Sequence, residues 1–160
     1  MYLSIMQPTY LPWVGYFELI HKAEYFVFFD DVQFVKKSWH HRNKIATPCG
    51  ELMLTVPVLS KGKRFQLLNQ VQINNNEKWR KKHLKSIAIN YSKSKYFDKY
   101  YNELETFYSK QYEFLVDLNI DIISFLCNCL GIETKFYRSS ILDIDGEREK
   151  KIINIIKYFD

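Results

Sequence analysis

The sequence predicts an α/β protein, and three observations lead to that prediction. Residues 1–30 read as strand, turn, helix and strand, which is the size of a βαβ unit. Aromatic-rich helical patterns dominate the middle of the chain, over about residues 77–130, and a further strand and helix follow them. Alternation of strands with helices is typical of the α/β class.

The first βαβ unit rests on three short segments. Residues 1–6 alternate loosely, as in a short buried strand, and residues 13–22 place apolar residues on one helix face. Tyr25–Phe29 is a continuous run of apolar β-forming residues, which indicates a strand covered on both sides. A crossover between two parallel strands is almost always right-handed.

The segment after the second strand is less regular. Residues 35–50 are polar and read as irregular. Residues 51–58 read as a third strand with Pro57 near its end. Residues 66–73 fit either a short strand or an extended segment.

Helical spacing then returns. Three helices rich in aromatic and aliphatic residues are predicted over residues 77–91, 95–109 and 111–130. Gly131 fits the C-terminal cap of the third helix. Residues 134–140 read as a strand, and residues 146–159 read as a charged amphipathic helix. This order predicts a Rossmann-like, three-layer, mostly parallel sheet within a single domain spanning residues 1–160.

Length and composition limit the possible classes. A chain of 160 residues can form one domain with its own core. The three cysteines show no disulfide framework, which indicates a reducing compartment, and Cys127 and Cys129 read as core residues of a helix. The first residues lack a basic leader, and no apolar run approaches the ~18 residues of a membrane span. We therefore expect a cytoplasmic protein without a transmembrane segment, and peripheral membrane contact stays open.

The formal net charge is +5, and part of it comes from Lys78–His83. A basic cluster either attracts phosphate groups or forms a solvated helix face. Binding of nucleic acid through this cluster would be strongly salt-dependent, and it is the least favoured interpretation.

The first turn carries the first candidate site. Pro8 and Pro12 fix its backbone, and a turn between a strand and a helix is where open α/β proteins bind ligands. The candidate substrate-binding residues are Gln7, Tyr10, Trp13 and Tyr16. The alternative is a packed aromatic turn that locks the first helix to the sheet. Gln7 is the hardest of these to explain as packing, because a buried amide needs partners.

Two carboxylates, Asp30 and Asp31, follow the second strand. In an open α/β sheet this edge faces the ligand, and one of two adjacent strand residues points into the pocket. Such a carboxylate can act as a general base, bind a sugar hydroxyl or hold a metal. The alternative is a carboxylate that forms an ion pair with Arg42 or Lys36 or that caps a turn. Because no third ligand is obvious, no metal site is predicted.

Three further groups are candidates. His83 shares a helix face with Trp79 and is either a general acid or base near neutral pH or a structural histidine. Trp39, Arg42 and Asn43 would form a platform for a base or sugar with a phosphate-binding fork, or else a loop anchored by one buried Trp. Ser139 and Ser140 follow the last strand, where they either bind phosphate or cap a turn.

Several familiar signatures are absent from the sequence. No glycine-rich phosphate loop, no nucleophile elbow and no histidine pair with zinc spacing occurs. Nothing near Cys49 marks it as an activated nucleophile. The sequence therefore identifies no cofactor.

A series of short sequence motifs resembles the WbqC-like family of bacteria. The motifs occur in the same order as in that family over the whole chain: Gln7–Phe17, Asp30–Phe34, Ser38-Trp39 and Arg42-Asn43, Leu54–Val58, and Trp79 and His83 before Tyr91. The resemblance implies a cytoplasmic protein associated with surface-polysaccharide (O-antigen or capsule) biosynthesis, and it implies no particular reaction. It favours functional roles for His83 and Asn43, and it adds Gln33 to the substrate-binding candidates.

The same resemblance implies a truncation. Family members continue beyond the helix that ends near Phe159, with a further strand and loop, so we expect this chain to lack the family's C-terminal segment.

A weaker resemblance concerns the fold alone. The first strand, turn and helix look like those of nucleotidyltransferases and class I aminoacyl-tRNA synthetases, and Asp30–Phe34 looks like the corresponding strand end of pantoate–β-alanine ligase. Pro12 and Tyr16 stand where those enzymes carry histidines.

Two functions are carried forward. The first is an enzyme that transfers an acyl or aminoacyl group to a nucleotide-linked or lipid-linked amino sugar, with Asp30, Asp31 and His83 as catalytic residues. The second is a non-catalytic module of the same pathway that binds a nucleotide sugar or a partner enzyme. An exposed sheet edge would also favour a homodimer.

Overall fold

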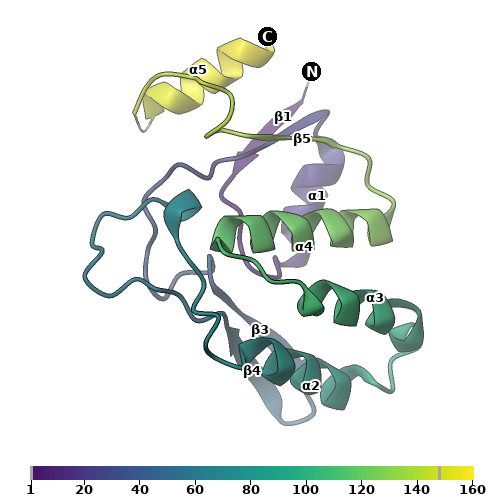
Figure 1. Cartoon of the computed structure of the whole chain (residues 1–160). Helices are drawn as coiled ribbons and strands as arrows, with labels where there is room; N and C mark the ends of the chain where they lie inside the picture. The colour runs from purple at the N-terminus through teal and green to yellow at the C-terminus, as the bar shows by residue number, and fades with distance from the viewer. Residues whose placement is uncertain (1, 148) are drawn as a thin grey trace.

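A three-stranded parallel sheet forms one end of the molecule (Figure 1). The computed structural model describes residues 2–147 and 149–160. The sheet has the order β1-β2-β5, with β1 at Leu3–Met6, β2 at Tyr25–Phe28 and β5 at Lys135–Arg138. Leu3 and Lys135 flank Tyr25, so the three strands end level with one another.

The central strand is apolar on both faces, as its sequence predicts. On one face the ring of Phe26 packs against Tyr16 of α1 (Val14–Lys22), with 5.5 Å between ring centroids. On the other face Tyr25 packs against Phe159 of α5 (Glu149–Phe159), at 5.2 Å. Helices therefore contact both faces of the sheet.

The longest helix of the described residues, α4 (Leu115–Leu130), lies between the sheet and the helices below it (Figure 1). Its buried residues recur at helical spacing, and Leu115, Ile122 and Ile123 are fully buried. The predicted cap is confirmed: Gly131 has φ 69°, and its N–H donates to the carbonyls of Cys127 and Asn128. The left-handed region suits glycine because no Cβ is present to clash.

The other end of the molecule is a hairpin covered by helices (Figure 1). An antiparallel pair, β3 (Arg42–Thr47) and β4 (Gly50–Thr55), contacts α2 (Trp79–Tyr91). The next helix, α3 (Phe97–Ser109), packs on α2. A short 3-10 helix, η1 (Leu68–Gln70), packs on α4.

Most predicted elements are present, and the differences have physical causes. All five predicted helices form, with ends shifted by a few residues. The predicted irregular segment 35–50 contains β3, which was missed because its residues are polar and half exposed. The predicted strand at 51–58 exists as β4, but it pairs with β3 instead of joining the parallel sheet.

The fold class is confirmed at the coarser level of a mixed α/β protein with a parallel sheet. Among the described residues this sheet has three strands in the order of the chain, without the strand-order reversal of a doubly wound fold. The reason is that the segment between β2 and β5 forms the hairpin and three helices. In residues 2–147 and 149–160, no helix is long and apolar enough to cross a bilayer.

The docking of α5 depends on Ile155, which is fully buried, whereas Ile153 is 50% exposed. We predict that Ile155→Ala lowers the free energy of unfolding by about 2–5 kcal/mol, because it leaves a cavity under the helix. Ile153→Ala, the matched control, should change it by less than about 0.5 kcal/mol. Urea denaturation measures both, and equal losses would contradict this account of α5.

Candidate functional site

The carboxyl ends of the three parallel strands meet at one edge of the sheet. Met6, Phe28 and Arg138 lie side by side in the register, so the residues that follow them converge. These are Gln7 after β1, Asp30 and Asp31 after β2, and Ser139 and Ser140 after β5. This is the edge at which open α/β sheets bind ligands.

Asp30 is fully buried, and both of its carboxylate oxygens accept hydrogen bonds. Its Oδ2 accepts from Arg138 Nε and from Ser140 Oγ, each at 2.8 Å. Its Oδ1 accepts from the backbone N–H of Ser140 at 3.0 Å and lies 3.2 Å from Ser139 Oγ. A buried carboxylate is tolerated when it is paired and fully hydrogen-bonded, as here. With these contacts, the carboxylate of Asp30 is better placed to hold Arg138 in position than to accept a proton from a substrate.

Asp31 lies nearer the surface. Its Oδ1 accepts from Ser139 Oγ at 2.5 Å, and its Oδ2 is paired with the ammonium of Lys151 from α5. The side chains of Asp31 and Lys151 are 14% and 17% exposed. This carboxylate therefore keeps some access to solvent, which Asp30 lacks.

Arg138 joins the aspartates to α4. Nη1 of Arg138 donates a hydrogen bond to Oδ1 of Asp117 at 2.9 Å. Burial alone would lower the pKa of Arg138, but hydrogen bonds and attraction from Asp30 and Asp117 outweigh burial and raise it. Guanidinium groups have five N–H donors, so donors remain for an anionic ligand.

A cavity of about 320 Å³ adjoins Arg138. Its other walls are apolar and come from β2, β5, α4 and the loop after β5: Phe28, Ile120, Phe136, Tyr137, Ile141 and Leu142. The edge thus offers a cation, a carboxylate network and an apolar wall.

The predicted ion-pair partners of the aspartates, Arg42 and Lys36, are not those observed. The actual partners lie 108 and 120 residues from the aspartates, and no sequence signal linked them.

Gln7 lies at the same edge and is exposed. Its side-chain oxygen accepts from His40 Nε2 at 2.7 Å, and its backbone carbonyl accepts from the hydroxyl of Tyr16 at 3.1 Å. Burial, followed by the neighbouring His41, lowers the pKa of His40 to about 4, so this ring is neutral at pH 7. A neutral ring that donates from Nε2 fixes the orientation of the Gln7 amide.

The turn after Gln7 is held from three sides. Asn119 of α4 donates to the carbonyl of Pro8 at 3.2 Å, and Asn43 of β3 donates to that of Leu11 at 2.6 Å. The N–H of Tyr10 donates to the carbonyl of Trp39 at 3.1 Å. These contacts hold Leu11 in the left-handed region at φ 46°, which costs a non-glycine residue energy.

The aromatic residues of this turn divide into two kinds. Tyr10 and Tyr16 are buried, as in the packed-turn alternative, whereas Trp13 is 65% exposed and begins α1. Trp39 is 50% exposed, so the alternative of a loop anchored by a buried Trp is wrong. Gln7 and Trp13 are thus the predicted residues of this turn that a ligand can reach.

The remaining predicted site residues lie elsewhere. Arg42 donates to the carbonyl of Lys37, and the side chain of Gln33 donates to the carbonyl of Arg64 at 3.2 Å. His83 is 4% exposed and belongs to a buried cluster with Tyr10, Tyr108 and Trp79. The structure therefore separates His83 from the aspartates with which the sequence grouped it.

His83 is hydrogen-bonded within this cluster. Its Nδ1 lies 2.8 Å from the hydroxyl of Tyr10, and that hydroxyl is in turn hydrogen-bonded to the hydroxyl of Tyr108. Sequence analysis missed Tyr108 because it lies within an aromatic-rich helix.

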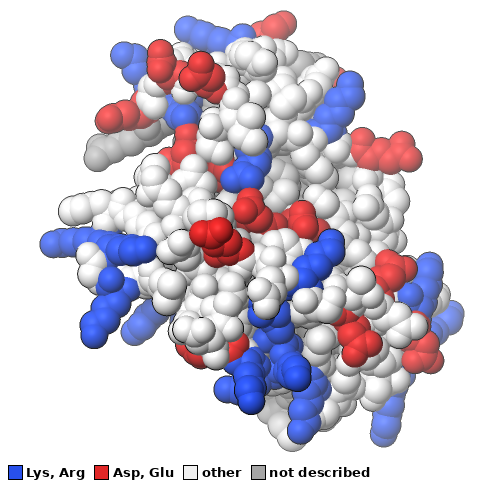
Figure 2. Space-filling view, viewed as in Figure 1, with Lys and Arg blue, Asp and Glu red and all other residues white. Residues whose placement is uncertain are grey.

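The basic cluster faces a separate cavity of about 570 Å³. Lys78, Arg80 and Lys81 line it, together with Tyr108 from α3. Figure 2 shows Lys and Arg side chains gathered over α2.

In the described part of the chain, no three histidine, cysteine or acidic side chains are grouped as a metal site would need.

Comparison with known proteins identifies the family. The model of the WbqC-like protein family matches residues 7–160. The chain belongs to the WbqC-like protein family. A protein of Mycobacterium tuberculosis (strain ATCC 25618 / H37Rv), named "Uncharacterized protein Rv1507c", is 32% identical to this WbqC-like chain over 154 residues. The match covers 96% of the chain and 66% of that relative. No solved structure matches.

The ion pair at the edge predicts a large stability loss on substitution. Asp30→Asn should lower the free energy of unfolding by about 3–5 kcal/mol, because Arg138 keeps its charge without its buried partner. Asp117→Asn, whose side chain is 44% exposed, should cost at most about 1 kcal/mol. Guanidinium denaturation at pH 7 compares the two, and equal costs would contradict the central role of Asp30.

The buried histidines predict acid sensitivity. Burial lowers the pKa of His83 to about 4, against an ordinary value near 6.5. Between these values the unfolded chain binds more protons than the folded one, so stability falls as the pH drops from about 6.5 to 4.

Replacing His83 tests this pH dependence. His83→Gln should reduce the slope of unfolding free energy against pH by up to about 1.4 kcal/mol per pH unit. Gln70→Ala, at an exposed position without a titratable group, is the control and should keep the wild-type slope. Urea titrations between pH 7 and 4.5 measure the slopes, and an unchanged slope in His83→Gln would refute the assignment.

Proposed function

We propose that this WbqC-like protein is an enzyme of surface-polysaccharide biosynthesis that transfers an acyl or aminoacyl group to a nucleotide-linked or lipid-linked amino sugar. One observation carries the proposal: Asp31, Ser139 and Arg138 converge from two strand ends beside a cavity of about 320 Å³. A cation, a partly exposed carboxylate and an apolar wall suit a phosphate-bearing sugar substrate.

Each residue has a distinct role in this proposal. Arg138 binds an anionic group of the substrate with its remaining N–H donors. Asp31 orients the attacking amine or hydroxyl and accepts its proton, and Gln7 contacts the sugar. Asp30 positions Arg138 without reacting. The proton-transfer role proposed for His83 has weaker support, because a ring buried at 4% exposure cannot touch a substrate at the edge.

A non-catalytic binding module is the second candidate function. One observation favours it: both oxygens of Asp30 are hydrogen-bonded and Asp31 is paired with Lys151, so among the described residues of this edge neither aspartate is an unpaired base. The two functions differ in turnover. An enzyme converts bound substrate when protein is in excess, whereas a binding module releases it unchanged.

Complementation of a strain lacking the gene tests the enzymatic proposal. Asp31→Asn and Gln7→Ala should each reduce surface-polysaccharide synthesis by at least about tenfold, since a positioned acid–base group contributes a factor of ~100 or more. Asp160→Asn and Gln70→Ala, at exposed positions, are the matched controls and should retain synthesis.

Folding must be checked in the same experiment. The thermal midpoint of Gln7→Ala should stay within a few degrees of the wild type, because Gln7 is exposed. If both variants retain wild-type synthesis, the proposed site is wrong. If they lose synthesis while protein in excess converts no candidate substrate, the binding module is the correct function.

A further inference from the structure

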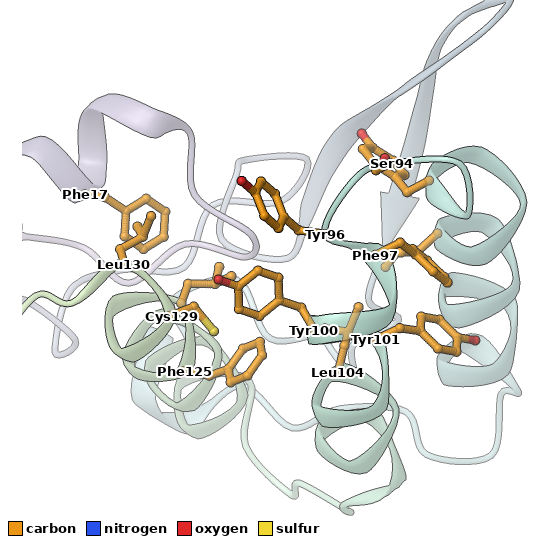
Figure 3. A pocket seen from close by; sticks show the side chains of 13 residues that line it. Phe17, Ser94, Tyr96, Phe97, Tyr100, Tyr101, Leu104, Phe125, Cys129 and Leu130 are labelled. Atoms are coloured by element: carbon orange, nitrogen blue, oxygen red, sulfur yellow. The ribbon is translucent and has the colours of Figure 1, made fainter.

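Another pocket, of about 410 Å³, lies on the helical side of the molecule, between α3 and α4 (Figure 3). Its lining includes Phe17 of α1, Ile87 of α2 and Leu104 of α3, together with Phe125 and Leu130 of α4. Cys129 of α4 and Tyr100 of α3 also line it (Figure 3). Asp117 begins α4 at the sheet edge, 12 residues before Cys129, so the two sites are about 18 Å apart along the helix.

The wall of this pocket is almost entirely hydrocarbon. None of the described side chains that line it is charged, and its polar groups are hydroxyls at Ser94 and the tyrosines and the thiol of Cys129. A sugar, a nucleotide or a peptide backbone would leave polar groups unpaired here, at a cost in free energy. A hydrocarbon chain needs no hydrogen bonds, so it is the ligand that this wall accepts.

The pocket continues into a neighbouring cavity. A second cavity, of about 510 Å³, shares Phe17 and Leu130 with the first and extends to Val14 at the start of α1. Figure 3 places the Phe17 and Leu130 side chains next to each other. Val14 and Leu130 are 84% and 60% exposed, which is unusual for large apolar residues in one place. The first cavity is apolar, whereas Glu18 and His21 also line the second, so the two together form a groove with a long apolar part and one polar end.

Two lysines lie against tyrosines that line the first cavity, and Glu103 is an acidic neighbour of Lys99 and Cys129. The ammonium of Lys95 lies 5.1 Å from the ring centre of Tyr96, and that of Lys99 lies 4.8 Å from the ring centre of Tyr100. Both tyrosines line the pocket. An apolar groove with cations against its rim is complementary to an amphiphile with an anionic head.

We propose that this groove binds a single-chain lipid phosphate, with the hydrocarbon chain against Phe17, Phe125 and Leu130 and the phosphate at Lys95 and Lys99. The inference goes beyond the group-transfer proposal and does not depend on it. The site lies at the other end of α4 from the carboxylate network, so each can be tested alone.

The cysteines of the wild-type chain provide the first test. Cys129 lines the pocket, whereas Cys49 is exposed in the hairpin turn and Cys127 is buried. Decyl phosphate at ten times its dissociation constant should slow maleimide labelling of Cys129 by about tenfold, because the labelled site is occupied. The labelling rate of Cys49, measured by mass spectrometry in the same samples, should not change. Inorganic phosphate should protect neither thiol.

Substitutions separate the chain from the head group. Cys129→Trp fills the pocket and should weaken decyl phosphate binding by at least about tenfold by calorimetry, whereas Cys49→Trp should not. The double variant Lys95→Glu, Lys99→Glu should weaken decyl phosphate by a similar factor and leave decanol binding unchanged. The double variant Lys150→Glu, Lys157→Glu, at exposed positions of α5, is its charge-matched control.

Three outcomes would overturn the proposal. Labelling of Cys129 at the same rate with and without decyl phosphate excludes the site, even if Cys129→Trp fails to fold. If protection of Cys129 against maleimide depends on the protein concentration and not on decyl phosphate, a second copy of the chain covers the groove. Equal protection by decyl phosphate and inorganic phosphate means that the hydrocarbon chain contributes nothing.

Discussion

The buried carboxylate of Asp30 is the constraint on which the rest of the structure depends. A charge with no exposure to water is stable only when its oxygens are hydrogen-bonded, and three donors from β5 and its following turn supply these bonds: Nε of Arg138 and the backbone N–H and hydroxyl of Ser140. The same guanidinium that pairs with Asp30 also reaches α4 through Asp117. The next residue, Asp31, holds α5 at the sheet edge through its ion pair with Lys151. The sheet and two helices are therefore joined at a single polar cluster.

A second set of buried polar contacts fixes the turn after β1. Asn119 is fully buried, and its amide bridges the carbonyls of Pro8 and His40. The turn would otherwise expose these carbonyls to an apolar core, where an unpaired group is costly. Because α4 supplies both Asn119 and Asp117, the ends of β1 and β5 are positioned by one helix. This common support gives the carboxyl edge the rigidity that a binding site requires.

The parts of the structure that depend on local periodicity were predictable from the sequence. Helices with apolar residues every three to four positions, and β2 with its apolar run, were found close to their observed bounds. The family was predicted from its motifs, and the match over residues 7–160 confirms it. The short strand β3 was missed, since its polar residues carry no alternating signal.

Long-range pairs could not be predicted in the same way. Asp30 and Asp31 were identified by their position after a strand, but their partners Arg138 and Lys151 are more than a hundred residues away. Tyr10 and His83 were each singled out, yet their hydrogen bond depends on how α2 packs against the first turn. A spacing rule applies within one element, whereas such contacts arise from the arrangement of several.

The distance in sequence between Asp30 and Arg138 also bears on how the chain is made. The β1-α1-β2 unit leaves the ribosome before β5, because Arg138 is synthesised 108 residues after Asp30. Until then Asp30 has no partner and stays hydrated, so the edge of β2 that later pairs with β5 stays open. Contacts of such high sequence separation form slowly, since a long loop must close first. The nascent chain therefore passes through a stage in which its most buried strand is exposed.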